Sequence, residues 1–121
     1  MKAHAASIPI GMLVVYDKGF KFKYKKYYIR KGINTIGSHP TSHILISEGE
    51  RIPDRVANLT VSDDLVTLEP LLPASVHVLS NLNKKSNLMV ELTPGFRYVV
   101  EMEKDFMICG RKALMQISPY E

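Results

Sequence analysis

Few side chains in this chain have the types and spacing that catalysis or metal binding requires. His39 and His43 stand four residues apart, but in an irregular segment that spacing sets no common face, and no Cys or carboxylate cluster completes a ligand set. Asp63 and Asp64 follow Ser62, a composition typical of a turn. The phosphate-loop, dinucleotide-binding, zinc-protease and serine-hydrolase motifs do not occur in the sequence. We therefore predict a non-enzymatic protein with no metal and no cofactor.

The polar segments between short apolar stretches are better placed to bind a ligand. Ile36-Gly37 leads into a polar turn, and the apolar stretch Ile44–Ile46 follows it. A charged loop that contains residues 51–55 then precedes an alternating strand from about Asn58. Loops held by a rigid sheet commonly carry binding residues, so we expect any site to lie here.

Positive charge is concentrated in the first third of the chain. The net charge is +4, and seven cations fall within fourteen residues: Lys18, Lys21, Lys23, Lys25, Lys26, Arg30 and Lys31. Such a local field attracts acidic partners, including nucleic acid and phosphorylated peptides. A solvated strand face is the simpler explanation of the same pattern.

The elements that must position these residues are strands. Short β-branched and aromatic stretches recur every eight to twelve residues with turn signals between them, and no window has a helical apolar period. We predict an all-β, two-sheet sandwich of about ten to eleven strands in residues 11–121, after a loose tail over residues 1–10. The single cysteine, Cys109, excludes an internal disulfide and suits a reducing compartment. No apolar run approaches the length of a membrane span, so we expect no membrane partner.

The first hairpin is predicted to join residues 12–16 to residues 20–24. Phe20, Phe22 and Tyr24 alternate with lysines, which is typical of a half-buried strand. We favour the core for these three rings, with an exposed aromatic patch as the alternative. Tyr27 and Tyr28 are adjacent in a further short strand, so they point to opposite faces and one of them is partly exposed.

The order of these segments resembles the forkhead-associated (FHA) domain. The resemblance runs from Gly11 to Ile117 and depends on Ile36-Gly37-Ser38, Ile44-Leu45-Ile46 and the segment from Ser80 to Val90. It implies an FHA/SMAD-like sandwich of about eleven strands that binds phosphothreonine peptides through loops at one end. Within the family the chain is most similar to the N-terminal domain of chromatin adaptors of the mediator-of-DNA-damage-checkpoint type. That similarity implies a nuclear DNA-damage-response protein that forms a homodimer.

Several phosphate-binding positions of the family are altered here. Ser38 stands where the family has arginine after the glycine, and the family's Ser-x-x-His corresponds to Pro53, Asp54, Arg55 and Val56. The family's Asn-Gly-Thr loop falls near Ser86 and Asn87, where only Asn87 could act as the asparagine. Ser38 cannot provide a cationic fork, Pro53 has neither hydroxyl nor N–H, and Val56 cannot hydrogen-bond across the loop. Losing two phosphate contacts weakens binding roughly a hundredfold or more. Arg55, Lys84 and Lys85 are possible replacements.

Three functions follow, in this order. The first is a dimerisation and protein-interaction module whose phosphothreonine binding is lost or much weakened, with a dimer patch formed by Phe20, Phe22, Tyr24, Tyr27 and Tyr28. The second is a working phosphothreonine reader rebuilt from Arg55, Lys84, Lys85 and Asn87. The third is a basic β-module that binds nucleic acid through residues 18–31. Against the third, strand alternation places the aromatic rings and the lysines on opposite faces, so direct nucleic-acid binding ranks last.

Overall fold

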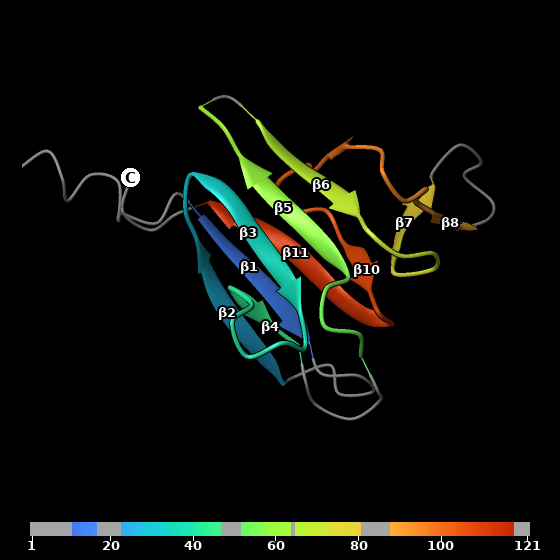
Figure 1. Ribbon diagram of the computed structural model, residues 1–121. Coiled ribbons are helices and arrows are strands. Elements are labelled where there is room, and N and C mark those ends of the chain that lie inside the picture. Colours follow the sequence, from blue (N-terminus) through green and yellow to red (C-terminus); the bar gives the residue numbers. More distant parts are fainter. Residues whose placement is uncertain (1–10, 17–22, 47–51, 64, 81–87, 118–121) are drawn as a thin grey trace, which may run out of the picture.

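The computed structural model is a sandwich of two sheets (Figure 1). It describes residues 11–16, 23–46, 52–63, 65–80 and 88–117, and this part of the chain contains eleven strands and no helix. The prediction of an all-β, two-sheet sandwich is therefore confirmed. The tail predicted over residues 1–10 lies outside the described ranges.

One sheet has six strands in the order β2-β1-β11-β10-β7-β8, and the other has five in the order β4-β3-β5-β6-β9. The strand bounds of the first sheet are β1 Gly11–Tyr16, β2 Tyr24–Ile29, β7 Val76–Ser80, β8 Leu88–Glu91, β10 Phe106–Ile108 and β11 Arg111–Ile117. Those of the second are β3 Gly32–Gly37, β4 Ile44–Leu45, β5 Ala57–Val61, β6 Val66–Pro70 and β9 Tyr98–Val99. Only β3 and β4 pair in parallel among the named strands; the other pairs are antiparallel.

The core fills the space between the two sheets. Along β5 and β6 every second side chain is buried, the period expected of strands with one face on a core. The largest fully buried side chains come from both sheets: Leu13, Ile29, Ile108 and Met115 from the first, and Ile36, Ile44, Leu59 and Leu68 from the second. Each such side chain contributes about 1.5–3 kcal/mol through loss of water-exposed apolar area.

Two predicted hairpins have different outcomes. The turn at Ser62-Asp63 does join β5 to β6, and the Ser62 N–H donates to the Leu65 carbonyl at 2.9 Å. The first hairpin differs from its prediction, because β1 pairs with β2, which begins only at Tyr24. Residues 17–22 lie outside the described ranges, and Phe20 and Phe22 are among them.

Core placement is wrong for Tyr24, whose side chain is 49% exposed. The register explains this, since Tyr24 pairs with Tyr16 while the inward residues Leu13 and Val15 pair with Tyr27 and Lys25. Tyr24 therefore lies on the outer face of the six-stranded sheet, on an edge strand. Tyr27 packs partly against the core and Tyr28 is exposed, so these neighbours do point to opposite faces as predicted.

Candidate functional site

The loop that follows β3 and the segment that precedes β5 lie side by side. The Ser38 N–H donates to the Pro53 carbonyl at 3.1 Å, and the His39 N–H donates to the Asp54 carbonyl at 3.3 Å. A Cβ on Gly37 would lie 1.9 Å from the Asp54 carbonyl oxygen, so only glycine permits this approach. The two segments that the sequence singled out thus form one surface at the end of the sandwich.

Two of the predicted phosphate-contact positions are occupied by interactions within the protein. The Ser38 hydroxyl donates to the Ile52 carbonyl at 2.5 Å and is directed into the loop junction. Pro53 is exposed, but it offers no N–H and its carbonyl already accepts from Ser38. Neither residue presents a donor to a ligand.

Val56, at the family's histidine position, is a core residue. It is fully buried, its N–H donates to the Ile36 carbonyl at 2.9 Å, and its carbonyl accepts from the Leu71 N–H and the Ser75 hydroxyl. The backbone of Val56 therefore holds the loop against β3, and the Val56 side chain itself makes no hydrogen bond.

Among the described residues, Arg55 supplies the cation of this surface. Its Nη1 donates to the Ser42 hydroxyl at 2.7 Å and its Nη2 donates to the Thr41 hydroxyl at 3.1 Å. Thr41 is held in turn by His39, whose Nδ1 lies 2.7 Å from the Thr41 hydroxyl oxygen. Within the described residues no carboxylate pairs with Arg55. Arg55 is partly buried. Because a guanidinium has five N–H donors and two are engaged here, Arg55 can also bind an anion.

The sequence did not indicate the roles of Thr41 and Ser42, whose hydroxyls hold Arg55, or of His39, whose imidazole contacts Thr41. All three belong to the polar turn after Gly37. Thr41 and Ser42 bond to Arg55 only when this turn folds over the 52–56 segment, and His39 contacts Thr41. Their density of hydroxyls was the only available signal.

The remaining predicted residues do not join this cluster in the described structure. His43 Nδ1 lies 3.2 Å from the Thr35 hydroxyl oxygen, whereas His39 contacts Thr41, so the two histidines have different partners. No group of three potential metal ligands occurs among the described residues. Asp54 is exposed, and Asp63 forms an ion pair with Lys31 at the β5–β6 turn. Lys84, Lys85, Ser86 and Asn87 lie outside the described residues, as do Phe20 and Phe22 of the predicted dimer patch.

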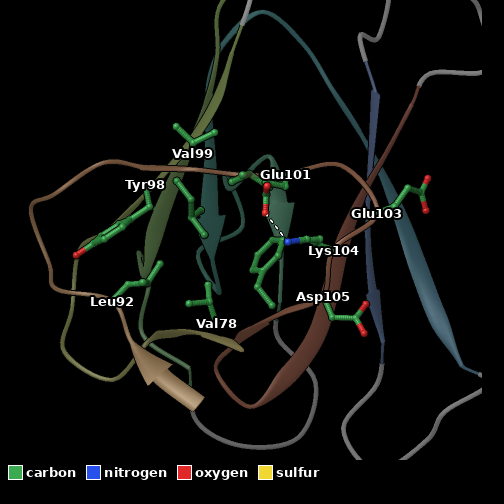
Figure 2. Close-up of a pocket in the computed structure, with 11 residues that line it drawn as sticks. Val78, Leu92, Tyr98, Val99, Glu101, Glu103, Lys104 and Asp105 are labelled. Carbon is green, nitrogen blue, oxygen red and sulfur yellow. Dashed lines mark ion pairs between the residues drawn. The ribbon is translucent and has the colours of Figure 1, made fainter. Parts of the chain in front are cut away.

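A separate pocket of about 500 Å³ opens near β9 and β10 (Figure 2). Its floor is apolar, with Leu68, Leu92 and Phe106, and its rim carries Glu101, Glu103 and Asp105. Among the described residues that line it, Lys104 is the one cation, and it forms an ion pair with Glu101 at 2.9 Å. No residue of the loop surface around Arg55 lines this pocket.

Cys109 is partly buried in the two-residue turn between β10 and β11. Burial raises the pKa of its thiol above the ordinary value of 9.0, and the nearby Arg111 offsets this in part. The thiol is therefore protonated at neutral pH, which fits a packing role better than a nucleophilic one.

Comparison with known proteins places the fold. No protein-family model and no curated protein matches the chain. The chain is similar to the FHA domain of the CT664 protein from Chlamydia trachomatis, with a TM-score of 0.64, 13% identity and coverage of 89% of this chain and 97% of that one. It is also similar to the MEK1 FHA domain, with a TM-score of 0.67, 9% identity and coverage of 97% and 98%. The same MEK1 domain in complex with a HOP1 phosphothreonine peptide matches with a TM-score of 0.62, 9% identity and coverage of 92% and 99%.

These likenesses show that the chain has the fold of FHA domains.

The described residues contain no helix that is long and apolar enough to cross a membrane.

Proposed function

We propose that this domain is a non-catalytic protein-interaction module in which phosphothreonine recognition is much weakened. The observation that carries the proposal is the inward hydrogen bond from the Ser38 hydroxyl to the Ile52 carbonyl at 2.5 Å. A phosphate needs outward-facing donors, and here the residue after Gly37 spends its only side-chain donor inside the protein. Pro53 adds none.

Arg55 supports residual binding of a phosphorylated or acidic side chain. It comes from the neighbouring segment, and its anchors Thr41 and Ser42 fix the guanidinium over the loop surface. A single guanidinium without a second, hydroxyl-bearing contact attracts phosphate but does not distinguish threonine from serine. The expected ligand is thus an acidic or phosphorylated segment of a protein, bound with low selectivity.

Calorimetry with a degenerate phosphothreonine peptide library, its phosphoserine counterpart and the unphosphorylated library tests this. We expect weak binding that requires phosphate, equal for the two phosphorylated libraries, and lost in Arg55→Ala. Arg97→Ala is the matched control, since Arg97 is an exposed arginine of the β9 edge that pairs with Glu69. Tight binding that selects phosphothreonine would contradict the proposal and support a reader rebuilt from Arg55 with the loop that contains Lys84, Lys85 and Asn87.

Self-association is a second candidate function, favoured by exposed apolar side chains along the β8–β9 side of the sandwich. Met89, Val90, Phe96 and Val99 are 42–62% exposed on or beside two edge strands. Tyr24 and Tyr28 of the predicted patch lie instead among lysines of β2, which would repel each other across a two-fold axis. We therefore propose that a homodimer contact forms on the β8–β9 side. Sedimentation at micromolar concentration should show a dimer that Phe96→Asp dissociates, and a monomeric wild type would reject this role.

A place in a nuclear DNA-damage-response chromatin adaptor is the cellular setting we propose. Its support is the sequence resemblance across Gly11 to Gly37. Imaging of the tagged chain before and after DNA breakage tests this, and exclusion from the nucleus under both conditions would overturn it.

A further inference from the structure

The outer face of the six-stranded sheet brings tyrosines and lysines together. In β2, Tyr24, Lys26 and Tyr28 share one face because they are two residues apart. Their partners on β1 are Tyr16, Val14 and Met12, which extend the same face. The register of β1 with β11 continues it to Lys112, Leu114 and Gln116. We call the surface formed by these nine side chains the Tyr/Lys face.

The aromatic rings and the cations of this face are in direct contact. The rings of Tyr16 and Tyr24 have centroids 5.5 Å apart and an interplanar angle of 56°. Lys26 Nζ lies 5.8 Å from the Tyr24 ring centroid, and Lys112 Nζ lies 5.2 Å from that of Tyr16. Such contacts are worth only about 0.5–1 kcal/mol at exposed sites, so a ligand ring can displace them.

Two rings of the face are open to solvent. Tyr24 and Tyr28 are 49% and 48% exposed, whereas Met12 and Val14 on the neighbouring strand β1 are buried although they lie outside the inter-sheet core. Along the strand the two exposed tyrosines are roughly 13 Å apart. They form two separate platforms on one side of the sheet.

The charge around the Tyr/Lys face is mainly positive. The sequence contains no Asp or Glu between Asp17 and Glu48, a stretch that holds all of β2 and β3. Lys26 makes no ion pair in the described structure, and Lys112 has a single acidic neighbour, Asp105, at 3.4 Å. The ligand that complements this surface carries repeated negative charge.

We propose that the Tyr/Lys face binds single-stranded nucleic acid. Stacking surfaces for single strands combine aromatic rings, on which bases of any sequence stack, with cations that contact the phosphates. The objection from the sequence was that alternation separates rings from lysines. In β2, however, Lys26 shares the face of Tyr24 and Tyr28, because it lies two residues from each and Lys25 occupies the intervening inward position.

Other occupants fit the face less well. A second copy would set Lys26 and Lys112 against the same residues of its partner, which repel. An acidic peptide satisfies the lysines but leaves the two exposed tyrosine rings without a stacking partner. A single strand of nucleic acid satisfies both groups.

The test is fluorescence anisotropy of a labelled oligothymidylate of about fifteen nucleotides, titrated with the whole chain at several salt concentrations. We expect salt-dependent binding that weakens about fivefold or more in Tyr24→Ala and in Tyr28→Ala. Lys26→Ala should reduce the slope of log K against log salt by about 0.7. Circular dichroism of each variant checks that these exposed substitutions leave the fold intact.

Matched controls separate this site from the rest of the surface. Lys104→Ala removes an exposed lysine of the pocket rim, and Arg97→Ala removes an exposed arginine beside β9, so both should bind as wild type. Absence of binding at low salt would overturn the inference, as would wild-type affinity of both tyrosine variants. Displacement of the oligonucleotide by poly-glutamate as effectively as by unlabelled oligothymidylate would identify an acidic peptide as the ligand instead.

Discussion

The α-carbon of Gly37 packs against the carbonyl of Asp54 so closely that an added Cβ would lie 1.9 Å from that oxygen. The contact joins the end of β3 to the segment that delivers Arg55. Two backbone hydrogen bonds lie beside it, from Ser38 to Pro53 and from His39 to Asp54. The close approach of the two loop segments therefore requires a glycine at position 37.

Gly37→Ala should destabilise the domain by about 3 kcal/mol or more, because the obstacle is backbone and cannot move aside as a side chain can. Urea unfolding measures the change. Gly95→Ala is the comparison, since its positive φ of 88° brings strain of about 1–2 kcal/mol but no atom lies within 4 Å of the new Cβ. Equal losses in the two variants would show that the Gly37 contact relaxes.

Asn34 is a buried amide whose substitution should be costly. Its Nδ2 donates to the carbonyls of Arg30 at 2.9 Å and Leu59 at 3.2 Å, and its Oδ1 accepts from the Arg30 N–H. Asn34→Ala leaves these backbone groups unsatisfied, and we expect a loss of about 2–3 kcal/mol. Asn34→Asp keeps the shape but turns donors into acceptors facing carbonyls, so it should be the less stable variant at neutral pH. Thermal denaturation distinguishes the two, and a tolerated Asn34→Asp would contradict the assigned amide orientation.

Cys109 should give stability a dependence on alkaline pH. Burial raises the pKa of the folded-state thiol above 9.0, so the native state holds the proton more tightly than the unfolded state does. The contribution of the Cys109 thiol to the free energy of unfolding is complete below the unfolded-state pKa, and it is lost as pH rises through and above 9.0. Urea midpoints of wild type and Cys109→Ala should therefore converge between neutral and alkaline pH. A constant difference between them would refute the effect of burial.

An arginine at position 38 together with a serine at position 53 should raise the affinity for phosphothreonine peptides. In Ser38→Arg with Pro53→Ser, a cationic fork and a hydroxyl return to the loop surface, each worth roughly 1.5–3 kcal/mol as a charge-assisted bond. Calorimetry with the phosphothreonine library should show a gain of roughly tenfold for each substitution. Ser38→Gln is the neutral control for the arginine. If Ser38→Gln gains as much as Ser38→Arg, charge is not what the site lacks.

Much of the scaffold could be predicted from local pattern. Alternation of buried and exposed residues along β5 and β6 was visible in the sequence, as was the turn at Ser62, because a strand with one face on a core has a period of two. The strand order also sufficed to suggest the FHA fold. The departures at Ser38, Pro53 and Val56 were equally visible, since they are residue identities.

Side-chain placement at sheet edges was harder to predict. Tyr24 has the sequence pattern of a core residue, yet it is exposed because β2 is an edge strand and the register with β1 sets its face outward. Alternation indicates which residues share a face but not which face meets the core.

The amino-acid sequence by itself determined the two-sheet fold class, the residue types at positions 38, 53 and 56, and the excess of positive charge near β2, because each follows from residue type and short-range period. Only the tertiary structure decided that Arg55 is held by Thr41 and Ser42, that Ser38 points inward, and that Tyr16, Tyr24, Lys26 and Lys112 meet on one surface. These are contacts between segments distant in the chain. Their geometry depends on strand order and register, which no local pattern specifies.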